Sequence, residues 1–375
     1  MSYTMEEYAR MLAEPVRASA YFDAVRESVR PGMVVADVGA GPGVLGIYAA
    51  TLGARRVFLV EPDRSVNAAR ALAMENGVAG RVEVIRAPST EIELPERADV
   101  IVSDLRGVTP FHGRHLEAAA DMRRRLLAPG GVCIPRRDRL FTALVEDEAL
   151  HARTVGAWSG VPDLLAYDSL TALMANGWFR ARAGGEQMLS APSPFVTLDY
   201  DQPAPPLHAS WEVRSARDGT AHGLLLWFDT ELTDRIGLSN APTAPPALYG
   251  QAFFPFRAGL PLRRGDRVAL DLRASLVGDD YAWSWNARAD DGRCERHSTL
   301  QSIPLDRESL ARRSERCAPR RSSEGDVLRA LLDAADGCAT FGELAGMLHD
   351  RFDDRFSTRQ AALDYVTSLD DLWAR

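Results

Sequence analysis

The sequence VVADVGAGPGVLGIYAA, residues 34–50, joins a short apolar run to a helix-like segment through three closely spaced glycines. Gly39, Gly41 and Gly43 let the backbone turn sharply and lie against a ligand, and the following helix offers free N–H groups. A second apolar run, RVFLVEP at residues 56–62, comes next. The glycines alone also suit a tight turn without a ligand. Together the segments predict one βαβ unit.

The alternation of strand and helix patterns continues to about residue 150. The further segments are a helix at 65–77, strands at 81–87 and 98–105, a helix at 115–131 and strand material at 131–147. Strands separated by helices imply a parallel, doubly wound sheet. We therefore expect an α/β Rossmann-like domain over residues 31–138, preceded by an N-terminal helical cap over residues 1–30.

The pattern changes after residue 150. Apolar and polar residues now alternate in short segments punctuated by Gly, Pro, Asn and Asp, as at 194–201, 207–216, 222–232, 267–276 and 281–290. This is typical of antiparallel strands, and it predicts a β-barrel or sandwich domain over residues 139–304. An arginine-rich segment without apolar periodicity follows and predicts a linker at 305–324. A helical module is expected over residues 325–375.

Composition limits the classes of function. The 375 residues suggest two or three domains, and a net charge of -8 gives no global basic field to hold nucleic acid. The four cysteines have neither a metal-ligand spacing nor a C-x-x-C pair, so no metal site is indicated. The N-terminus lacks a secretory pattern, and no apolar run approaches the ~20 residues of a membrane helix. We expect a cytoplasmic protein with neither nucleic acid nor a membrane as partner.

Two carboxylates accompany the glycines. Asp37 precedes the first glycine by two residues, and Glu61 ends the second predicted strand. An acid at the tip of that strand can accept the ribose hydroxyls of a bound nucleoside. Two carboxylates suit the cationic sulfonium and ammonium of S-adenosylmethionine better than the phosphates of NAD, because like charges repel.

At this point the sequence resembles a known family. Residues 34–104 are similar to the cofactor domain of the protein arginine methyltransferases, which are class I S-adenosylmethionine-dependent methyltransferases. The segments MLAEPVR at 11–17 and LLAPGGVCIP at 126–135 resemble that family's N-terminal helix and its crossing into the barrel. The resemblance is detailed to about residue 140, architectural to about residue 300, and does not include the C-terminal module.

The resemblance implies roles in binding S-adenosylmethionine, whose product is S-adenosylhomocysteine. Arg17 would pair with the cofactor carboxylate, and Glu61 would hold the ribose. Asp37 and the three glycines would line the amino acid and ribose portions. Ser89 and Thr90 would contact adenine, although the family usually has a glutamate where Thr90 stands.

The resemblance breaks at the loop SDLRGVTPFHGRHLE, residues 103–117. In the family this loop supplies two glutamates that hold the substrate guanidinium, and here their places fall to Asp104 and Gly113. A guanidinium would lose one of its charge-assisted partners. The family's Thr-His-Trp turn also has no match, because its positions align with Ala247, Leu248 and Tyr249.

The loop offers other chemistry. Methyl transfer needs a nucleophile held in line with the methyl group, so positioning dominates. We expect Asp104 to orient an amine or amide N–H and His112 to act as base, with Glu117 or His112 as alternative replacements for the missing carboxylate. His112 and His115 also fit structural roles, and Arg106 also fits an ion pair with Asp104.

Three functions follow. The leading hypothesis is an N-methyltransferase acting on a peptide side chain or small-metabolite nitrogen other than ordinary protein arginine. The second is a true protein arginine N-methyltransferase with a rebuilt substrate loop. The third is a non-catalytic scaffold that binds the cofactor, against which the intact cofactor residues argue.

Two features leave partners open. The C-terminal segments at 339–352 and 357–373 are similar to the helical part of small peptide-recognition domains found with enzymes that modify ribosomal peptides. That similarity suggests peptide or natural-product modification, and a dimerisation or capping module is the alternative. The arginine methyltransferase family usually dimerises through an arm inserted in the barrel, so the stretch at 167–185 implies a possible homodimer.

Overall fold

The computed structural model describes residues 3–162, 164–303, 307–312 and 314–369. The chain divides into two compact units, Met1–Pro304 and Leu305–Arg375. Parts of the expected segments lie outside the described residues, namely 1–2 of the cap, 163 and 304 of the barrel, 305, 306 and 313 of the linker, and 370–375 of the helical module.

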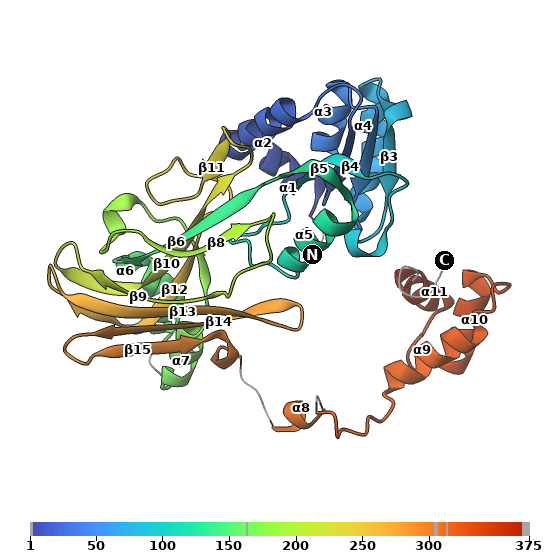
Figure 1. Ribbon diagram of the computed structural model, residues 1–375. Helices are drawn as coiled ribbons and strands as arrows, with labels where there is room; N and C mark the ends of the chain where they lie inside the picture. Colours follow the sequence, from blue (N-terminus) through green and yellow to red (C-terminus); the bar gives the residue numbers. More distant parts are fainter. Residues whose placement is uncertain (1–2, 163, 304–306, 313, 370–375) are drawn as a thin grey trace. The chain divides into compact units, whose positions relative to one another are not determined.

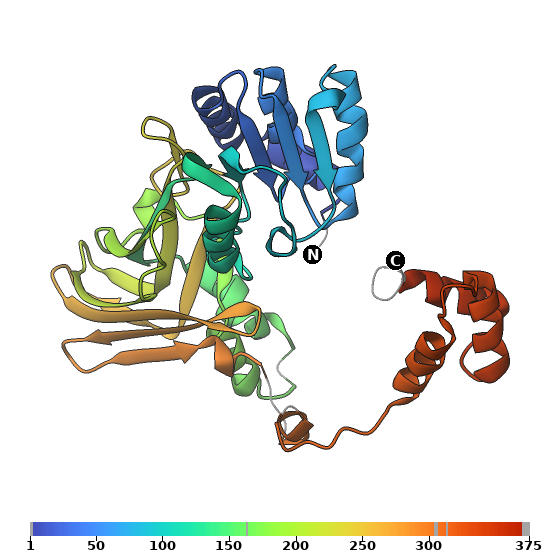
Figure 2. The ribbon, with the colours of Figure 1, turned by 45° about the vertical axis from the view of Figure 1, so that its right-hand side comes forward.

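Five strands of the first unit form a parallel sheet in the order β3-β2-β1-β4-β5 (Figure 2). Their bounds are β1 (Val34–Val38), β2 (Arg56–Val60), β3 (Val82–Ile85), β4 (Ala98–Ser103) and β5 (Leu127–Ile134). The central strands are continuous apolar runs because the sheet is covered on both faces. The carboxyl ends of β1, β2 and β4 therefore lie together at one edge.

Helices cover both faces of this sheet. On one face, Val35 and Leu59 share a core with α2 (Pro15–Ser28), α3 (Val44–Thr51) and α4 (Asn67–Glu75). On the other face, Phe58 and Ile101 share a core with α5 (His115–Arg125). Short 3-10 turns occur at η1 (Arg64–Val66), η2 (Ala79–Arg81) and η3 (Ser89–Glu91). The predicted doubly wound, Rossmann-like architecture is confirmed.

The N-terminal helix is interrupted just before the site. Helix α1 (Met5–Ala13) ends at Glu14, and α2 begins at Pro15, whose missing N–H costs nothing at a first helical position. The Glu14 carboxylate accepts hydrogen bonds from the N–H groups of Val16 at 2.9 Å and Arg17 at 3.0 Å. This cap fixes the first turn of α2 and the origin of the Arg17 side chain.

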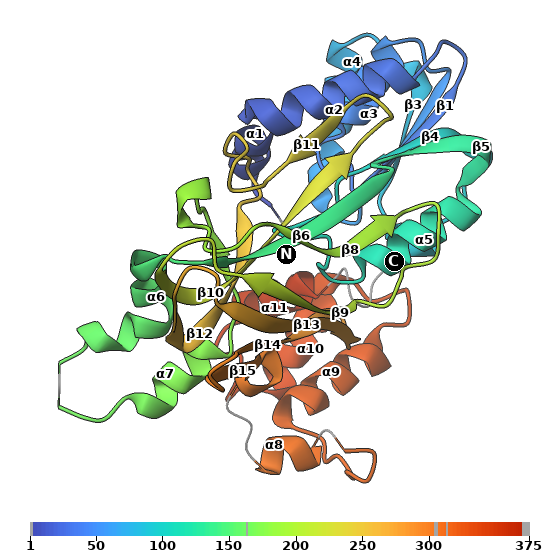
Figure 3. The same ribbon diagram turned by 60° about the vertical axis from the view of Figure 1, so that its left-hand side comes forward.

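Two antiparallel sheets follow, as predicted (Figures 1 and 3). The six-stranded sheet has the order β7-β12-β10-β6-β8 with β11 beside β10, and the four-stranded sheet has the order β15-β14-β13-β9. The bounds are β6 (Arg137–Val145), β7 (Phe179–Ala181), β8 (Ser193–Asp199), β9 (His208–Arg214), β10 (Gly219–Glu231), β11 (Gly237–Ser239), β12 (Gln251–Leu262), β13 (Arg267–Val277), β14 (Asp280–Ala289) and β15 (Cys294–Ser298).

Aromatic side chains join these two sheets. Trp285 of β14 is fully buried, lies 5.2 Å from the Phe254 ring of β12, and donates from its indole N–H to the Pro255 carbonyl at 2.8 Å. The remaining helical elements of this unit are α6 (Glu148–Thr154), η4 (Val155–Gly160), α7 (Asp168–Ala175), η5 (Gly185–Gln187) and η6 (Thr299–Gln301). The aromatic face of β14 is thus core.

The second unit is helical, as predicted for residues 325–375, but the predicted linker at 305–324 also contains a short helix and the first residues of the next one. Its elements are α8 (Arg307–Arg312), α9 (Ser323–Ala334), α10 (Phe341–Arg351) and α11 (Arg359–Ser368). Leu331, Leu348 and Val366 are fully buried in one small core that joins α9, α10 and α11. Across both units, none of the described helices is long and apolar enough to cross a membrane.

Candidate functional site

The glycine turn lies between β1 and α3, at the edge where the parallel strands end. Gly39 and Gly41 have positive φ angles of 73° and 52°, which side-chain-bearing residues rarely adopt. A Cβ atom on Gly41 would also lie 2.5 Å from the Tyr8 ring of α1, and one on Gly39 would clash with Leu105. The turn is therefore tightly covered by α1 and by the loop after β4.

The two predicted carboxylates hold this turn in place. Asp37 Oδ2 accepts a hydrogen bond from the Gly46 N–H of the first turn of α3 at 2.8 Å. Glu61 accepts from the N–H groups of Gly41 at 3.1 Å and Asp63 at 2.9 Å. Burial raises the pKa of Asp37 to about 7, opposed by the Gly46 N–H. Both acids therefore have a structural role in addition to facing the cavity.

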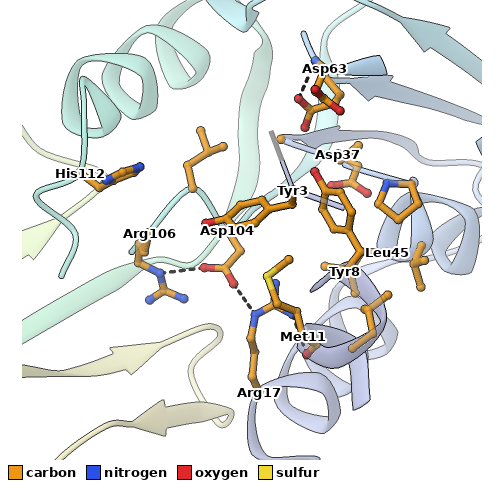
Figure 4. Close-up of a pocket in the computed structure, with 17 residues that line it drawn as sticks. Tyr3, Tyr8, Met11, Arg17, Asp37, Leu45, Asp63, Asp104, Arg106 and His112 are labelled. Atoms are coloured by element: carbon orange, nitrogen blue, oxygen red, sulfur yellow. Dashed lines mark hydrogen bonds and ion pairs between the residues drawn. The ribbon is translucent and has the colours of Figure 1, made fainter. Parts of the chain in front are cut away.

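A cavity opens at this edge of the sheet (Figure 4). Its walls come from the N-terminal segment, the glycine turn, the end of β2 and the loop after β4. Of the residues predicted to bind the cofactor, Arg17, Asp37, Gly39 and Glu61 line it. The other lining residues are Tyr3, Tyr8, Met11, Leu12, Ala40, Pro42, Val44, Leu45, Asp63, Asp104, Leu105, Arg106 and His112.

A second cavity adjoins the first. Ser89 and Thr90 line it, and it shares Gly39, Glu61 and His112 with the first cavity. Gly41 and Gly43 are not among the residues that line either cavity; they shape the turn behind it. The predicted cofactor residues thus lie in one continuous region. One group lines the first cavity, Ser89 and Thr90 line the second, and Glu61 lines both.

Asp104 follows the last residue of β4 and is almost fully enclosed. Its Oδ2 accepts from Arg17 Nε and from the Tyr249 hydroxyl, both at 2.6 Å, and its Oδ1 accepts from Arg106 Nε at 3.1 Å. Burial alone would raise the pKa of Asp104, but the two guanidinium groups overcome it and hold the pKa at about 2. Arg17 and Arg106 thus meet at one ionised carboxylate (Figure 4).

Arg106 continues this cluster into the protein. Its Nη1 donates to Asp138 Oδ1 at 2.8 Å and to the Thr230 hydroxyl at 2.5 Å, and its Nη2 donates to the Tyr21 hydroxyl at 2.5 Å. The Tyr200 hydroxyl donates to Asp138 Oδ2 at 2.7 Å. Neither the Arg106 nor the Asp138 side chain is exposed to solvent. The predicted ion pair of Arg106 with Asp104 is present, and Arg106 forms a second ion pair with Asp138.

The two histidines of the loop differ in environment. His112 is exposed and lies where the two cavities meet. His115 is buried, and burial followed by the nearby Arg106 charge lowers its pKa to about 4, so it is neutral at pH 7. Its Nε2 lies 3.2 Å from the Tyr200 hydroxyl. Of the two, His112 alone lines the first cavity, which also holds Asp104.

The two substrate positions that depart from the family also differ from each other. Gly113 brings no carboxylate, and a Cβ atom there would meet only the Asp279 carbonyl, at 3.8 Å. Tyr249, in contrast, is buried and its hydroxyl binds Asp104. In the sequence, Tyr249 stands out only as a departure from the Thr-His-Trp turn, and Asp138 and Tyr21 are not predicted site residues. The available signal was Asp138 itself, a buried acid at the start of a strand that is mainly apolar from Leu140 on.

The sequence is similar to known methyltransferases. The sequence model of the arginine methyltransferase oligomerization subdomain matches residues 136–286, and that of ribosomal protein L11 methyltransferase (PrmA) matches residues 20–106. The chain is 29% identical over 250 residues to protein arginine N-methyltransferase 6 of Xenopus laevis, covering 63% of this chain and 73% of that protein.

Two further relatives widen the range of named activities. An arginine N(omega)-methyltransferase of Streptomyces achromogenes subsp. streptozoticus is 29% identical over 271 residues, 70% of this chain and 74% of that protein. A probable histone-arginine methyltransferase CARM1 of Oryza sativa subsp. indica is 33% identical over 260 residues, which are 64% of this chain and 49% of that protein.

Solved structures share the fold. The Trypanosoma brucei PRMT1 enzyme-prozyme heterotetrameric complex with AdoHcy gives a TM-score of 0.71 at 20% identity, covering 79% of this chain and 98% of that chain. Arabidopsis thaliana protein arginine methyltransferase 10 gives a TM-score of 0.68 at 22% identity, covering 79% and 98%.

The fold, the glycine turn and these matches define an S-adenosylmethionine-dependent methyltransferase. Within that class, the chain is similar to the protein arginine methyltransferases, and its Rossmann-like sheet followed by antiparallel sheets has the fold of their solved structures. The matches favour an enzyme over the non-catalytic scaffold.

Proposed function

We propose that S-adenosylmethionine binds in the first cavity with Arg17, Asp37 and Glu61 as its polar contacts. This proposal rests on one observation. Three side chains from separate elements, namely α2, β1 and the end of β2, line the same cavity beside Asp104. Their charges fit a ligand that has a cationic sulfonium, a cationic ammonium and an anionic carboxylate. In the adjoining cavity, Ser89 and Thr90 would contact adenine.

Arg17 has donors left for the cofactor carboxylate. Its Nε binds Asp104 and Tyr249, and its Nη1 lies 3.5 Å from the Met11 carbonyl. No hydrogen bond within the described part of the chain involves Nη2. Arg17 can therefore hold a carboxylate with Nη2 while its Nε keeps Asp104 in place.

When bound, S-adenosylmethionine supplies an electrophilic methyl group on sulfonium. The chain's own residues position the acceptor: Asp104 Oδ1 accepts an N–H of the acceptor and so orients its nitrogen. His112, at the junction of the two cavities, takes the proton that the nitrogen loses.

Two acceptor classes remain. The names of the relatives favour arginine, which was the second hypothesis, over the leading hypothesis of another nitrogen. One observation favours a nitrogen of a different peptide side chain or metabolite, because Gly113 brings no second carboxylate to hold a guanidinium. The conclusion common to both is an N-methyltransferase with its acceptor beside Asp104.

The test is transfer of a labelled methyl group to three substrate sets: arginine-rich peptides, free arginine, and a desalted small-molecule and peptide extract of the source cells. Label on nitrogen in any set supports the proposed function, and its position names the acceptor. Asp104→Asn should lower the rate at least tenfold, whereas the exposed control Arg139→Met should keep it. Cofactor binding without transfer to any set would contradict the proposal.

Three further points are proposals. We infer a homodimer that uses the stretch at 167–185, since the matched subdomain is named for oligomerization. A cytoplasmic location and a role in peptide or natural-product modification stay predictions. The same holds for the limits 1–30, 31–138 and 139–304 within the first unit.

A further inference from the structure

The charges beside the proposed acceptor position cancel without any ligand. Two cations, Arg17 and Arg106, are paired with two anions, Asp104 and Asp138. The side chains are 12%, 0%, 6% and 0% exposed, in that order, so solvent screens them little. A buried ion is stable only when it is paired, and each of these four ions already has its partner.

The oxygen atoms of Asp104 are also almost fully used. A carboxylate has about four lone-pair positions, of which Arg17 and Tyr249 occupy two on Oδ2 and Arg106 occupies one on Oδ1. One position on Oδ1 is left. It can accept a single N–H, but not the two parallel N–H groups by which a guanidinium binds a carboxylate.

The other acids that line the two cavities already have partners: Asp63 accepts from the Ser65 N–H at 2.8 Å, and Glu117 pairs with Arg114. Asp37 and Glu61 are bound by the backbone N–H groups of the glycine turn and α3, and they face the proposed cofactor. Position 113 carries no side chain. A cationic acceptor would therefore stand beside two guanidinium groups with no anion of its own.

We propose that Arg106 determines the class of acceptor. Its guanidinium already pairs with the Asp104 oxygen that a cationic acceptor would need, so the enzyme selects an acceptor with an uncharged nitrogen. Amides, neutral amines and neutral heteroaromatic nitrogens belong to that class. This inference deepens the proposed function and rests on it. It assigns to Arg106 a role in specificity rather than in methyl transfer.

The test compares methylguanidinium with methylurea, its uncharged analogue, as probes for the S-adenosylhomocysteine-loaded enzyme in ligand-observed NMR titrations. Arg106→Met is combined with Asp138→Asn, because removing one member of a buried pair alone leaves an unpaired charge. We expect the double variant to bind methylguanidinium at least tenfold more tightly than the wild type, with methylurea binding unchanged. Arg139→Met, on the exposed face of β6, should resemble the wild type.

Two results would overturn the inference. One is equal methylguanidinium affinity in wild type and double variant, including no binding in either. The other is a wild type that already prefers methylguanidinium to methylurea. If the double variant does not fold, the wild-type preference alone decides. Failure of the wild type to bind S-adenosylhomocysteine is a separate outcome, which strikes at the proposed function and is measured first.

Discussion

Burial of a carboxyl group such as that of Asp37 disfavours its charged form unless hydrogen bonds and nearby cations compensate. Here one N–H, from Gly46, is the main compensation, Glu61 adds repulsion, and Arg17 adds attraction. Burial dominates and raises the pKa of Asp37 to about 7. In the free protein this carboxyl is therefore partly protonated at neutral pH.

Cofactor binding should depend on this proton. The cationic ammonium of the ligand favours ionised Asp37, so binding releases a proton below pH 7, and affinity rises with pH. We expect affinity for S-adenosylhomocysteine to increase about tenfold from pH 5.5 to pH 6.5 and to level off above pH 7. Calorimetric titrations in buffers of matched ionic strength measure this.

Asp37→Asn provides the control, because the amide oxygen can still accept the Gly46 N–H. Its affinity should be lower at pH 7 and nearly independent of pH over the same range. An unchanged pH dependence in this variant would show that another group titrates.

At the scale of single residues, the sequence predicted what local spacing determines. Asp37, Glu61 and the glycines follow from one strand-turn-helix pattern, and Arg17 from a short resemblance. Asp138, Thr230 and Tyr249 were out of reach, because they meet Arg106 or Asp104 from sequence distances of 32 to 145 residues. Only tertiary structure brings such distant polar groups together.

At the scale of elements, buried leucines of α10 stabilise the small core of the second unit. Leu348 is fully buried against α9 and α11, while Leu332 of α9 is 57% exposed. Leu348→Ala should destabilise the second unit by about 2–5 kcal/mol, and Leu332→Ala by much less. Hydrogen exchange of the amides in 323–368 measures both, and cofactor binding by the first unit should stay unchanged. Equal losses in the two variants would contradict this.

Element types were predictable from periodicity, and their limits were less so. The segment 115–131 reads as one helix, yet α5 ends at Arg125 and β5 begins at Leu127. Pro129 and Gly130 disfavour a helix interior, and pairing with β4 supplies the hydrogen bonds instead. Leu332 and Phe341 fit the apolar pattern of the C-terminal helices, but they lie at its exposed margin.

At the scale of the whole molecule, an exposed pair of leucines is available for the contact in the proposed dimer. Leu164 and Leu165, which lie directly before the stretch at 167–185, are 83% and 70% exposed. Replacing both by Asp should convert the dimer to a monomer in light scattering coupled to size exclusion. Leu300→Asp, at a site 61% exposed, is the matched control and should stay dimeric. A wild type that is monomeric at micromolar concentration would refute the dimer.

The separation of Asp104 from Tyr249 along the chain has a consequence for synthesis. The two residues are 145 positions apart. At ~5–20 residues per second, about 7–30 s pass on the ribosome between their translation. The parallel sheet can assemble in that interval, but Asp104 and Arg106 lack Tyr249 and Thr230 until β10 and β12 have emerged. Nascent chains thus pass through a stage in which the parallel sheet is complete but Asp104 and Arg106 lack part of their hydrogen-bond partners. We expect chaperone binding to be most important at that stage.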